Sequence, residues 1–291
     1  MYDIIIIGMG ISGITAGMYA KRSNKKVLII DKGMPGGLLN NIDKISNYPG
    51  LIDISGPDFA SVLENQVKSM DIPYVLEEVK EVKLNNEVKE VITTNKTYKA
   101  KKIILAMGRK PKYLGLDNEK DLLGRGLSTC AMCDANFYKN EDIAIVGTGN
   151  SALQEALYLA NIVNNIYLIN RRDGFRGEEM LVSEVKNNPK IKIIYNANIE
   201  SMNEENNKLS SITLDNGNTL NVKGVFIYIG YRPATEFIPQ EILEEDGYIK
   251  VNDKLETPLK GVYAIGDIIK KDTYQLVTAA SDGARVIYNM K

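Results

Sequence analysis

The sequence predicts an α/β fold of two three-layer domains, and three observations lead to that prediction. The chain has 291 residues, more than one ordinary domain needs, and 44% of them are hydrophobic. Two distant segments, residues 2–20 and 142–159, each combine a short apolar strand, a glycine-rich turn and a helix-period pattern. A second apolar strand follows each one, at residues 27–30 and 166–169. Such strand–helix–strand units build doubly wound, Rossmann-like sheets.

The charge and the N-terminus argue against several classes of protein. The net charge is −1, from 36 basic and 37 acidic residues, and no run of like charge marks a surface for nucleic acid or lipid. The apolar run Ile4–Ile7 is short and has no basic region before it, so it is expected to be a buried strand and not a signal peptide. No apolar stretch is long enough to span a bilayer. We expect a soluble, cytoplasmic protein with no nucleic-acid or membrane partner.

Two cysteines and no histidine limit the chemistry further. Cys130 and Cys133 cannot supply the four ligands of a Cys/His zinc site within one chain, so no metal is expected. Without imidazole, proton transfer must use carboxylates, lysine, tyrosine, thiols or water.

The first glycine-rich turn fits the pattern G-x-G-x-x-G at Gly8, Gly10 and Gly13, with Ser12 inside it. It follows a strand and opens a helix, the context in which this pattern binds a dinucleotide. The first glycine allows a tight turn, the second admits a pyrophosphate, and the third lets the helix pack on the strand. Asp31 ends the next strand, where a carboxylate can accept hydrogen bonds from ribose hydroxyls. A purely structural turn is the alternative.

The second turn has the same form, with alanine at the third glycine position. Its residues are Gly147, Thr148, Gly149, Asn150, Ser151 and Ala152. The next strand ends without a carboxylate, and Arg171, Arg172 and Arg176 follow. Arginines suit a ribose 2′-phosphate, so NADP(H) is preferred over NAD(H). The alternative is that these arginines form a solvated surface or pair with Glu178 and Glu179.

Shorter elements fill the rest of the chain. Strands are predicted at residues 102–105, 191–195, 209–214, 225–229 and 262–265, with a hairpin turn at residues 215–217. After the last strand come Gly266 and Asp267, and a helix is predicted from about Tyr274. Residues 112–117 and 232–236 are predicted to cross between the two domains.

Cys130 and Cys133 stand two residues apart near a predicted helix start. Amide groups at a helix N-terminus lower a thiol pKa, so the pair can cycle between dithiol and disulfide. An intersubunit zinc site or inert thiols are the alternatives. Asp134 follows at once, and it is either the acid that exchanges a proton with the leaving thiolate or a helix cap.

Together these motifs resemble the low-molecular-weight thioredoxin reductases of bacteria, class II of the FAD-dependent pyridine nucleotide-disulphide oxidoreductases. The resemblance runs from Gly8 to Gly283, and its most specific element is Cys-x-x-Cys-Asp just before the second glycine turn. Further matching segments are residues 35–37, 47–50, 106–108, 113–115, 124–126, 147–152, 171–176, 266–267 and 275–280.

The resemblance implies a path of electrons from NADPH through FAD to the cysteine pair and on to thioredoxin or a thioredoxin-like protein. Cys133 would lie against the flavin, Cys130 would attack the thioredoxin disulfide, and Asp134 would be the acid. It also implies a homodimer whose NADPH domain, residues 113–240, carries the dithiol and rotates on its connectors. This domain would be inserted into a discontinuous FAD domain, residues 1–112 and 241–291.

The same resemblance extends the list of cofactor-binding residues. For FAD the expected residues are Gly8, Gly10, Ser12, Gly13, Asp31, Gly36, Gly37, Asn47, Val79, Ala106, Gly108, Gly266, Asp267, Gln275, Leu276 and Val277. For NADPH they are Gly147, Gly149, Asn150, Ser151, Ala152, Arg171, Arg172 and Arg176.

Four positions depart from the family pattern. Leu38 stands in place of Gln, Met107 in place of Thr, Tyr274 in place of Arg and Asn170 in place of His. Three other functions stay open: a reductase that takes electrons from ferredoxin, a flavin ferredoxin–NADP reductase, and a non-catalytic redox sensor. The retained second turn and its arginines favour NADPH over ferredoxin, and the cysteine pair argues against the second alternative.

Overall fold

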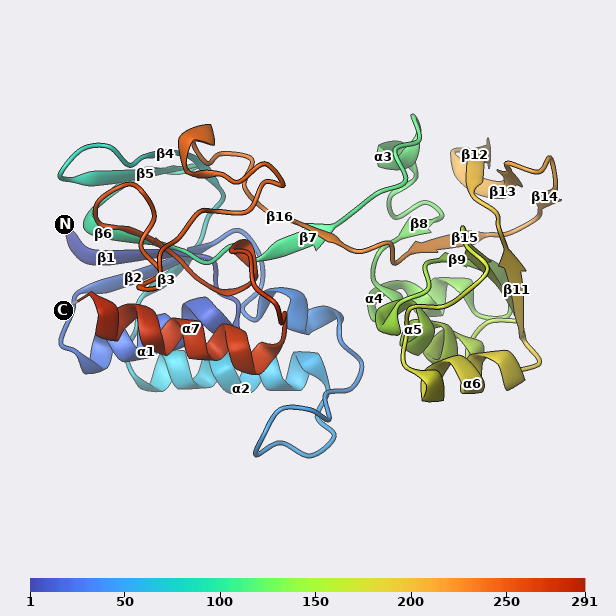
Figure 1. The fold of residues 1–291 in the computed structure, drawn as a ribbon, viewed down its shortest axis with the longest axis horizontal. Coiled ribbons are helices and arrows are strands. Elements are labelled where there is room, and N and C mark those ends of the chain that lie inside the picture. Colours follow the sequence, from blue (N-terminus) through green and yellow to red (C-terminus); the bar gives the residue numbers. More distant parts are fainter. Residues whose placement is uncertain (291) are drawn as a thin grey trace. The chain divides into compact units, whose positions relative to one another are not determined.

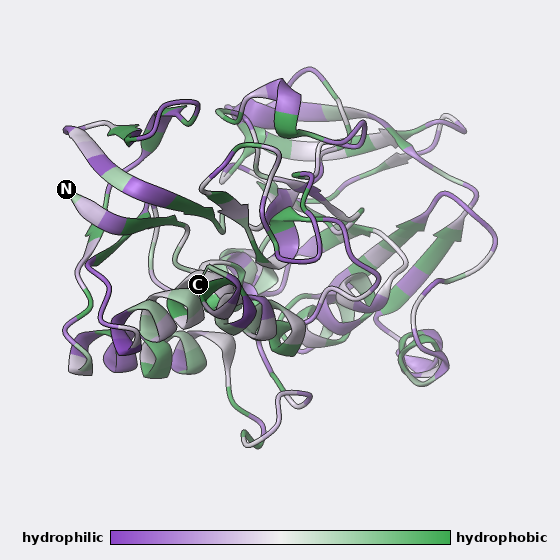
Figure 2. Cartoon of the chain, turned by 60° about the vertical axis from the view of Figure 1, so that its left-hand side comes forward, coloured by the Kyte–Doolittle hydropathy of each residue, from purple (hydrophilic) through white to green (hydrophobic). Residues whose placement is uncertain are grey.

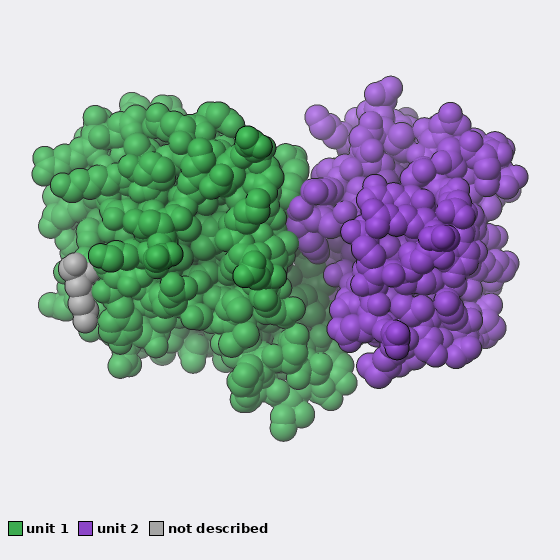
Figure 3. Space-filling model, in the orientation of Figure 1, with its two compact units in different colours: residues 1–110, 232–291 green, residues 111–231 purple. Residues whose placement is uncertain are grey.

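The structure is a computed structural model, and it describes residues 1–290. The chain forms two compact units, which we call unit 1 (residues 1–110 and 232–291) and unit 2 (residues 111–231; Figure 3). Unit 2 is one continuous segment inserted into unit 1. Among residues 1–290, no helix is both long and apolar enough to cross a membrane.

Unit 1 contains a seven-stranded sheet of order β3-β2-β1-β6-β5-β4, in which β17 also pairs with β6. Pairing is parallel among β3, β2, β1, β6 and β17, and antiparallel from β6 through β5 to β4. The strands are β1 (Tyr2–Ile7), β2 (Val27–Asp31), β3 (Tyr74–Leu76), β4 (Val79–Lys83), β5 (Lys89–Thr93), β6 (Thr97–Leu105) and β17 (Val262–Ala264).

Three helices lie along one side of this sheet: α1 (Ile11–Arg22), α2 (Gly56–Ser69) and α7 (Leu276–Asn289) (Figure 1). α1 and α7 pack very closely, because a Cβ atom at Gly283 would lie only 2.4 Å from the backbone oxygen of Ser12. The short 3-10 helices are η1 (Gly37–Asn41), η3 (Gln240–Ile242) and η4 (Gly266–Ile268).

The apolar strands that the sequence predicts form the core of unit 1. Ile5, Ile6, Ile29 and Ile30 are completely buried in this core. Strands buried on both faces are apolar throughout, which accounts for the continuous apolar runs in β1 and β2. Colouring by hydropathy shows apolar residues along the strands and polar residues in many of the connecting loops (Figure 2).

Unit 2 contains a five-stranded parallel sheet of order β11-β10-β9-β15-β8 and a separate three-stranded antiparallel sheet, β12-β13-β14. The strands are β8 (Leu127–Ser128), β9 (Asp142–Val146), β10 (Asn165–Asn170), β11 (Ile191–Tyr195), β12 (Ile199–Glu205), β13 (Lys208–Leu214), β14 (Thr219–Leu220) and β15 (Gly224–Ile227).

The parallel sheet of unit 2 separates two apolar clusters, which makes this unit three-layered as predicted. Phe226 and Leu168 belong to the cluster under the helices, whereas Val225 and Ile169 belong to the cluster under the antiparallel sheet. Neighbouring residues of one strand thus face opposite sides. The helices are α3 (Glu119–Leu122), α4 (Ala131–Asp134), α5 (Asn150–Ala160) and α6 (Glu179–Asn187), with the 3-10 helix η2 (Ala135–Tyr138).

Two strands, β7 (Arg109–Pro111) and β16 (Tyr231–Pro233), pair with each other where the chain passes between the units. The predicted end of the inserted domain at residue 240 differs from the structure, in which unit 2 ends at residue 231. Residues 232–240 belong to unit 1 because Ile238 is buried in its core and the amide of Ala234 donates to the carbonyl oxygen of Gly108, at 3.1 Å.

The structure also fixes the ends of two predicted elements. β15 ends at Ile227 and not at residue 229, because its neighbour β9 ends at Val146 and offers no partner beyond Tyr228. The last helix, predicted from about Tyr274, starts at Leu276, where Gln275 and Thr278 form a capping box that fixes the helix start.

Candidate active site

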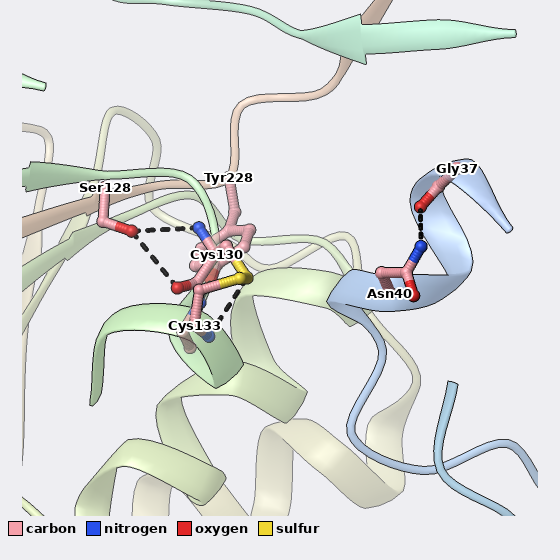
Figure 4. Close-up of a disulfide and its surroundings, with 7 residues drawn as sticks. Gly37, Asn40, Ser128, Cys130, Cys133 and Tyr228 are labelled. Atoms are coloured by element: carbon pink, nitrogen blue, oxygen red, sulfur yellow. Dashed lines mark hydrogen bonds between the residues drawn. A yellow bond between two sulfur atoms is a disulfide. The ribbon is translucent and has the colours of Figure 1, made fainter. Parts of the chain in front are cut away.

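Cys130 and Cys133 form a disulfide at the start of α4, as Figure 4 shows. Cys130 occupies the N-cap position, and the amide of Cys133 donates to its sulfur at 3.1 Å. An amide that points at sulfur stabilises the thiolate over the thiol when the disulfide opens. In this structure Cys130 is buried and Cys133 is exposed.

Two side chains of unit 2 hold the backbone around the disulfide (Figure 4). The hydroxyl of Ser128 accepts from the amide of Cys130 at 3.0 Å and donates to the carbonyl oxygen of the same residue at 3.2 Å. The hydroxyl of Tyr228 accepts from the amide of Ala131 at 2.9 Å. Burial, followed by the negative charge of Glu155, raises the pKa of Tyr228 well above its usual value, so the phenol stays neutral.

Asp134 lies at the end of α4, and its amide donates to the carbonyl oxygen of Cys130 at 3.2 Å. It precedes the 3-10 helix η2, but its side chain makes no capping hydrogen bond there. Its carboxylate is half-buried, and its negative charge, after burial, helps to raise the pKa of Tyr138. The helix-cap alternative for Asp134 is therefore not seen.

A pocket of about 690 Å³ in unit 2 joins the second glycine turn to the disulfide segment. The entire turn from Gly147 to Ala152 lines it, together with Arg171 and Arg176. Thr129, which directly precedes Cys130, and Tyr228 also line this pocket. One cavity thus contacts both the expected nucleotide-binding turn and the residues next to the cysteines.

The arginine segment is tied to the glycine turn by hydrogen bonds. The amide of Arg176 donates to the carbonyl oxygen of Thr148 at 2.9 Å, and Asn150 and Glu178 exchange two hydrogen bonds of 2.7 and 2.8 Å. Arg171 and Arg176 reach the pocket, but Arg172 does not line it.

The predicted alternative of arginines paired with nearby glutamates is not seen. Among residues 1–290, Arg171, Arg172 and Arg176 make no ion pair with Glu178 or Glu179. All three arginines are exposed, so their guanidinium groups can meet an anionic ligand.

Asn170 has a structural explanation. It is 1% exposed, its side-chain oxygen accepts from the amide of Arg172 at 2.9 Å, and its side-chain nitrogen donates to the carbonyl oxygen of Gly174 at 3.1 Å. Asn170, which departs from the family pattern, therefore lines the pocket and also holds the backbone of the arginine segment through these two hydrogen bonds.

The first glycine turn of unit 1 has the close backbone contacts that the pattern requires. A Cβ atom at Gly8 would lie 2.3 Å from the carbonyl oxygen of Ala106, and one at Gly13 would lie 2.0 Å from the carbonyl oxygen of Gly8. At Gly10, by contrast, no atom lies within 4 Å of such a Cβ. That open space above a helix start fits a pyrophosphate.

Asp31 is held by the same turn. Its carboxylate accepts from the amides of Met9 at 2.6 Å and Gly33 at 2.9 Å, which fixes it beside the turn with lone pairs left for hydroxyl groups.

Other residues expected to bind FAD lie near this turn or near Asp31. Gly36 forms an isolated parallel β-bridge with Gly10, and Gly37 follows Gly36 in the chain. Val79 starts β4, two residues after Glu77, whose amide donates to the carbonyl oxygen of Asp31 at 2.7 Å.

Segments from the two ends of the chain meet in unit 1. The side chain of Asn47 donates to Gln275 at 3.2 Å across 228 residues of sequence. A Cβ atom at Gly266 would lie 2.5 Å from the hydroxyl oxygen of Ser12, so the Gly266–Asp267 turn lies directly on the first glycine turn. The amides of Leu276 and Val277 have no protein acceptor among residues 1–290. The expected FAD residues therefore gather in one unit.

One oxygen of Asp267 supports a bound ligand at this position. Its Oδ1 atom is buried and has no hydrogen-bond partner among residues 1–290, whereas its Oδ2 atom accepts from Arg109 at 2.9 Å. A buried carboxylate oxygen is unfavourable without a donor, and a hydroxyl of the ribityl chain of FAD would supply one.

The sequence did not single out Ser128, Tyr228 or Arg109. Each acts through a tertiary contact with a residue far away or through the backbone, and no local motif marks such a contact. Across residues 1–290, no three Cys, Asp or Glu side chains form a cluster that could hold a metal ion.

Comparison with known proteins finds relatives that match nearly the whole chain and share its fold. The Pyridine nucleotide-disulphide oxidoreductase family model matches residues 2–284. The thioredoxin reductase of Bacillus subtilis (strain 168) is 38% identical over 290 residues, which cover 98% of this chain and 92% of that protein.

Solved structures give the same result. The thioredoxin reductase of Lactococcus lactis superposes with a TM-score of 0.93 at 33% identity, covering 99% of this chain and 97% of that one. The enzyme of T. acidophilum gives a TM-score of 0.90 at 30% identity, with the same two coverages. The chain belongs to the pyridine nucleotide-disulphide oxidoreductase family, among the low-molecular-weight thioredoxin reductases.

Proposed function

We propose that this flavoprotein oxidoreductase transfers two electrons from NADPH, through FAD bound to unit 1, to the Cys130–Cys133 disulfide and then to oxidised thioredoxin. The observation that carries the proposal is the position of the disulfide at a helix start beside the pocket of unit 2. The same unit thus holds a redox-active pair and a site that suits a nucleotide.

The residues of unit 1 support FAD as its cofactor. The open space at Gly10 suits the pyrophosphate, Asp31 suits the adenosine ribose, and the free Oδ1 atom of Asp267 suits a ribityl hydroxyl. The amides of Leu276 and Val277 can donate to a carbonyl oxygen of the flavin ring. When bound, the flavin accepts a hydride from nicotinamide and passes two electrons to a disulfide.

Arg171 and Arg176 support NADPH as the donor for unit 2. Both line the pocket, no Asp or Glu of residues 1–290 lines it with them, and a 2′-phosphate there would gain charge-assisted hydrogen bonds. We therefore expect Arg171→Gln and Arg176→Gln to lower the preference for NADPH over NADH, measured as the ratio of the two kcat/KM values. Arg125→Gln, at an exposed position of unit 2, is the matched control.

The chemistry of the dithiol follows from its surroundings. Reduction breaks the bond between the two sulfur atoms and adds two electrons and two protons. The amide of Cys133 stabilises a thiolate on Cys130, and Asp134 supplies or takes the proton as a thiolate leaves. The Cys130 thiolate then attacks the thioredoxin disulfide, and the Cys133 thiolate displaces reduced thioredoxin from the mixed disulfide, which re-forms the Cys130–Cys133 bond.

The deciding experiment is anaerobic absorbance spectroscopy of the purified yellow protein. One equivalent of NADPH should bleach the flavin, and oxidised thioredoxin should restore its absorbance. NADH should act more slowly than NADPH. If only reduced ferredoxin bleaches the flavin, the pocket of unit 2 is not a nucleotide site and the NADPH path is wrong.

Single cysteine variants test the roles within the dithiol. Cys133→Ser should accumulate a stable mixed disulfide between Cys130 and thioredoxin, detected by non-reducing electrophoresis and mass spectrometry. Cys130→Ser should give no such adduct. The reverse pattern would exchange the two roles, and a single reduction without sustained turnover of dithiobisnitrobenzoate would indicate a sensor.

The resemblance to the family also leads us to propose a homodimer. Light scattering coupled to gel filtration should give a mass of twice that of the chain, about 65 kDa from a chain of 32.3 kDa. A mass of a single chain would contradict this.

A further inference from the structure

Arg109, the first residue of β7, lies between an acid and an aromatic ring of unit 1. Its Nη2 atom donates to the Oδ2 atom of Asp267 at 2.9 Å. Its guanidinium also lies over the ring of Tyr274, 4.0 Å from the ring centroid. Both partners come from the C-terminal part of the chain, so Arg109 joins the strand that leaves unit 1 to the Gly266–Asp267 turn.

Tyr274 is itself fixed in place. Its ring centroid lies 6.0 Å from that of Tyr248, and its hydroxyl accepts from the amide of Lys271 at 3.5 Å. Burial and a hydrogen bond with Tyr248 raise the pKa of Tyr274 to about 12, so the ring stays neutral at physiological pH. A neutral electron-rich ring with a fixed orientation is a good platform for a guanidinium.

The side chains of Arg109 and Asp267 are 18% and 22% exposed, so water screens their ion pair only in part. This pair uses one oxygen of Asp267 and leaves the buried Oδ1 atom without a partner among residues 1–290. The remaining oxygen is thus held in one orientation, and the preceding residue, Gly266, packs against Ser12 of the first glycine turn.

We propose that Arg109 is a positioning residue for the flavin: it holds Asp267 so that the free oxygen accepts a hydrogen bond from the ribityl chain of FAD. This inference rests on the proposed function, because it assumes that FAD binds to unit 1. Arg109 also places a positive charge beside Asp267. Tyr274 stands where the family pattern has an arginine. The guanidinium of Arg109 packs against the ring of Tyr274, so a positive charge is still present in this region.

The test compares FAD with ADP, a probe that lacks the ribityl chain and the flavin ring. ADP would contact Gly10 and Asp31 but not Asp267. Both ligands are titrated into the full-length apoprotein, with FAD followed by fluorescence quenching and ADP by calorimetry. Arg109→Gln should raise the Kd for FAD at least about tenfold, the loss expected for a charge-assisted hydrogen bond, and leave the Kd for ADP within about twofold.

Three variants separate positioning from general damage. Arg22→Gln, at an exposed position at the end of α1, should change neither Kd. Tyr274→Leu removes the ring under Arg109 and should weaken FAD but not ADP, whereas Tyr274→Phe keeps the ring and should weaken FAD less. If Arg109→Gln does not fold, the Tyr274 pair gives the same test.

The reduction potential of the bound flavin is a second readout. Loss of the positive charge in Arg109→Gln should lower the potential, and Arg109→Lys should restore part of it. A double substitution with Asp267→Asn should cost little more FAD affinity than Asp267→Asn alone, because Arg109 acts through Asp267.

Two outcomes overturn different claims. If the folded Arg109→Gln and Tyr274→Leu variants bind FAD as the unmodified protein does, the role of Arg109 is wrong while the proposed function stands. If the unmodified apoprotein binds ADP but not FAD, the proposed function itself is wrong.

Discussion

The phenol of Tyr228 connects two parts of unit 2 through a single hydrogen bond. The residue lines the pocket, and its hydroxyl accepts from the amide of Ala131, the first helical residue after Cys130. Because α4 spans only Ala131–Asp134, it has few internal hydrogen bonds of its own. The position of the cysteines therefore depends on Tyr228 and Ser128 more than on the helix.

We predict that Tyr228→Phe destabilises the disulfide segment. The substitution leaves the amide of Ala131 without its acceptor, which should cost about 1–2 kcal/mol of unfolding free energy. Urea unfolding and hydrogen exchange at the amide of Ala131 measure the effect. Tyr167→Phe on β10 is the control and should change stability by less than about 0.5 kcal/mol. Equal exchange rates at Ala131 in Tyr228→Phe and the unmodified protein would contradict the role of Tyr228.

Tyr98 makes the stability of unit 1 depend on pH in the alkaline range. It is 6% exposed on β6 and donates to Glu77 at 3.0 Å, and burial together with this hydrogen bond raises its pKa to about 12. An unfolded tyrosine loses its proton near pH 10. The unfolded chain therefore binds fewer protons than the folded chain between about pH 10 and 12, so this contribution to stability is full below pH 10 and is lost as the pH rises to 12.

The expected outcome is that the unmodified protein loses more unfolding free energy between pH 9 and pH 11.5 than Tyr98→Phe does. Urea unfolding at a series of pH values measures both slopes. Tyr113→Phe, at an exposed position, should keep the slope of the unmodified protein. Parallel curves for Tyr98→Phe and the unmodified protein would show that Tyr98 does not govern the alkaline loss.

At the scale of elements, the two leading glycines of each glycine-rich turn differ in their surroundings: one lies against the backbone and the other lies beside open space. Gly147 has a φ of 143°, and a Cβ atom there would lie 2.3 Å from the carbonyl oxygen of Tyr228. Gly149 has a φ of −88°, and no atom lies within 4 Å of such a Cβ. Gly8 and Gly10 repeat this contrast in unit 1. The first glycine is required by the backbone contact, and the second has open space beside it, as a bound ligand would need.

The pair Gly147→Ala and Gly149→Ala tests this division. Gly147→Ala should lower the unfolding free energy by about 2 kcal/mol or more, through strain and the backbone clash. Gly149→Ala should leave stability within about 0.5 kcal/mol but weaken NADPH binding at least about tenfold. Thermal unfolding and calorimetric titration measure the two effects. Unchanged NADPH affinity in Gly149→Ala would place the nucleotide elsewhere.

At the scale of the whole molecule, unit 2 has the features of an independent domain. It is one continuous segment with its own parallel sheet, and apolar clusters lie on both faces of that sheet. Unit 1, in contrast, needs both ends of the chain, because β17 and α7 complete the sheet and the helical layer that begin at β1 and α1.

We predict that a fragment of residues 111–231 folds on its own. It should unfold cooperatively on heating and bind NADPH, whereas residues 1–110 alone should not form a stable domain. Circular dichroism and calorimetric titration test both statements. A fragment 111–231 without a cooperative transition would show that the connectors or unit 1 are needed to fold unit 2.

The sequence alone determined the two strand–turn–helix units, the disulfide pair and most strands, because strand and helix periodicity and the glycine pattern are local signals. Only the tertiary structure decided which distant residues meet. Asn47 contacts Gln275, Arg109 contacts Asp267, and Tyr228 contacts Ala131 across 228, 158 and 97 residues. The unit boundary at residue 231 likewise follows from the burial of Ile238 in the core of unit 1. Such contacts depend on how whole elements pack, and spacing along the chain carries no record of that packing.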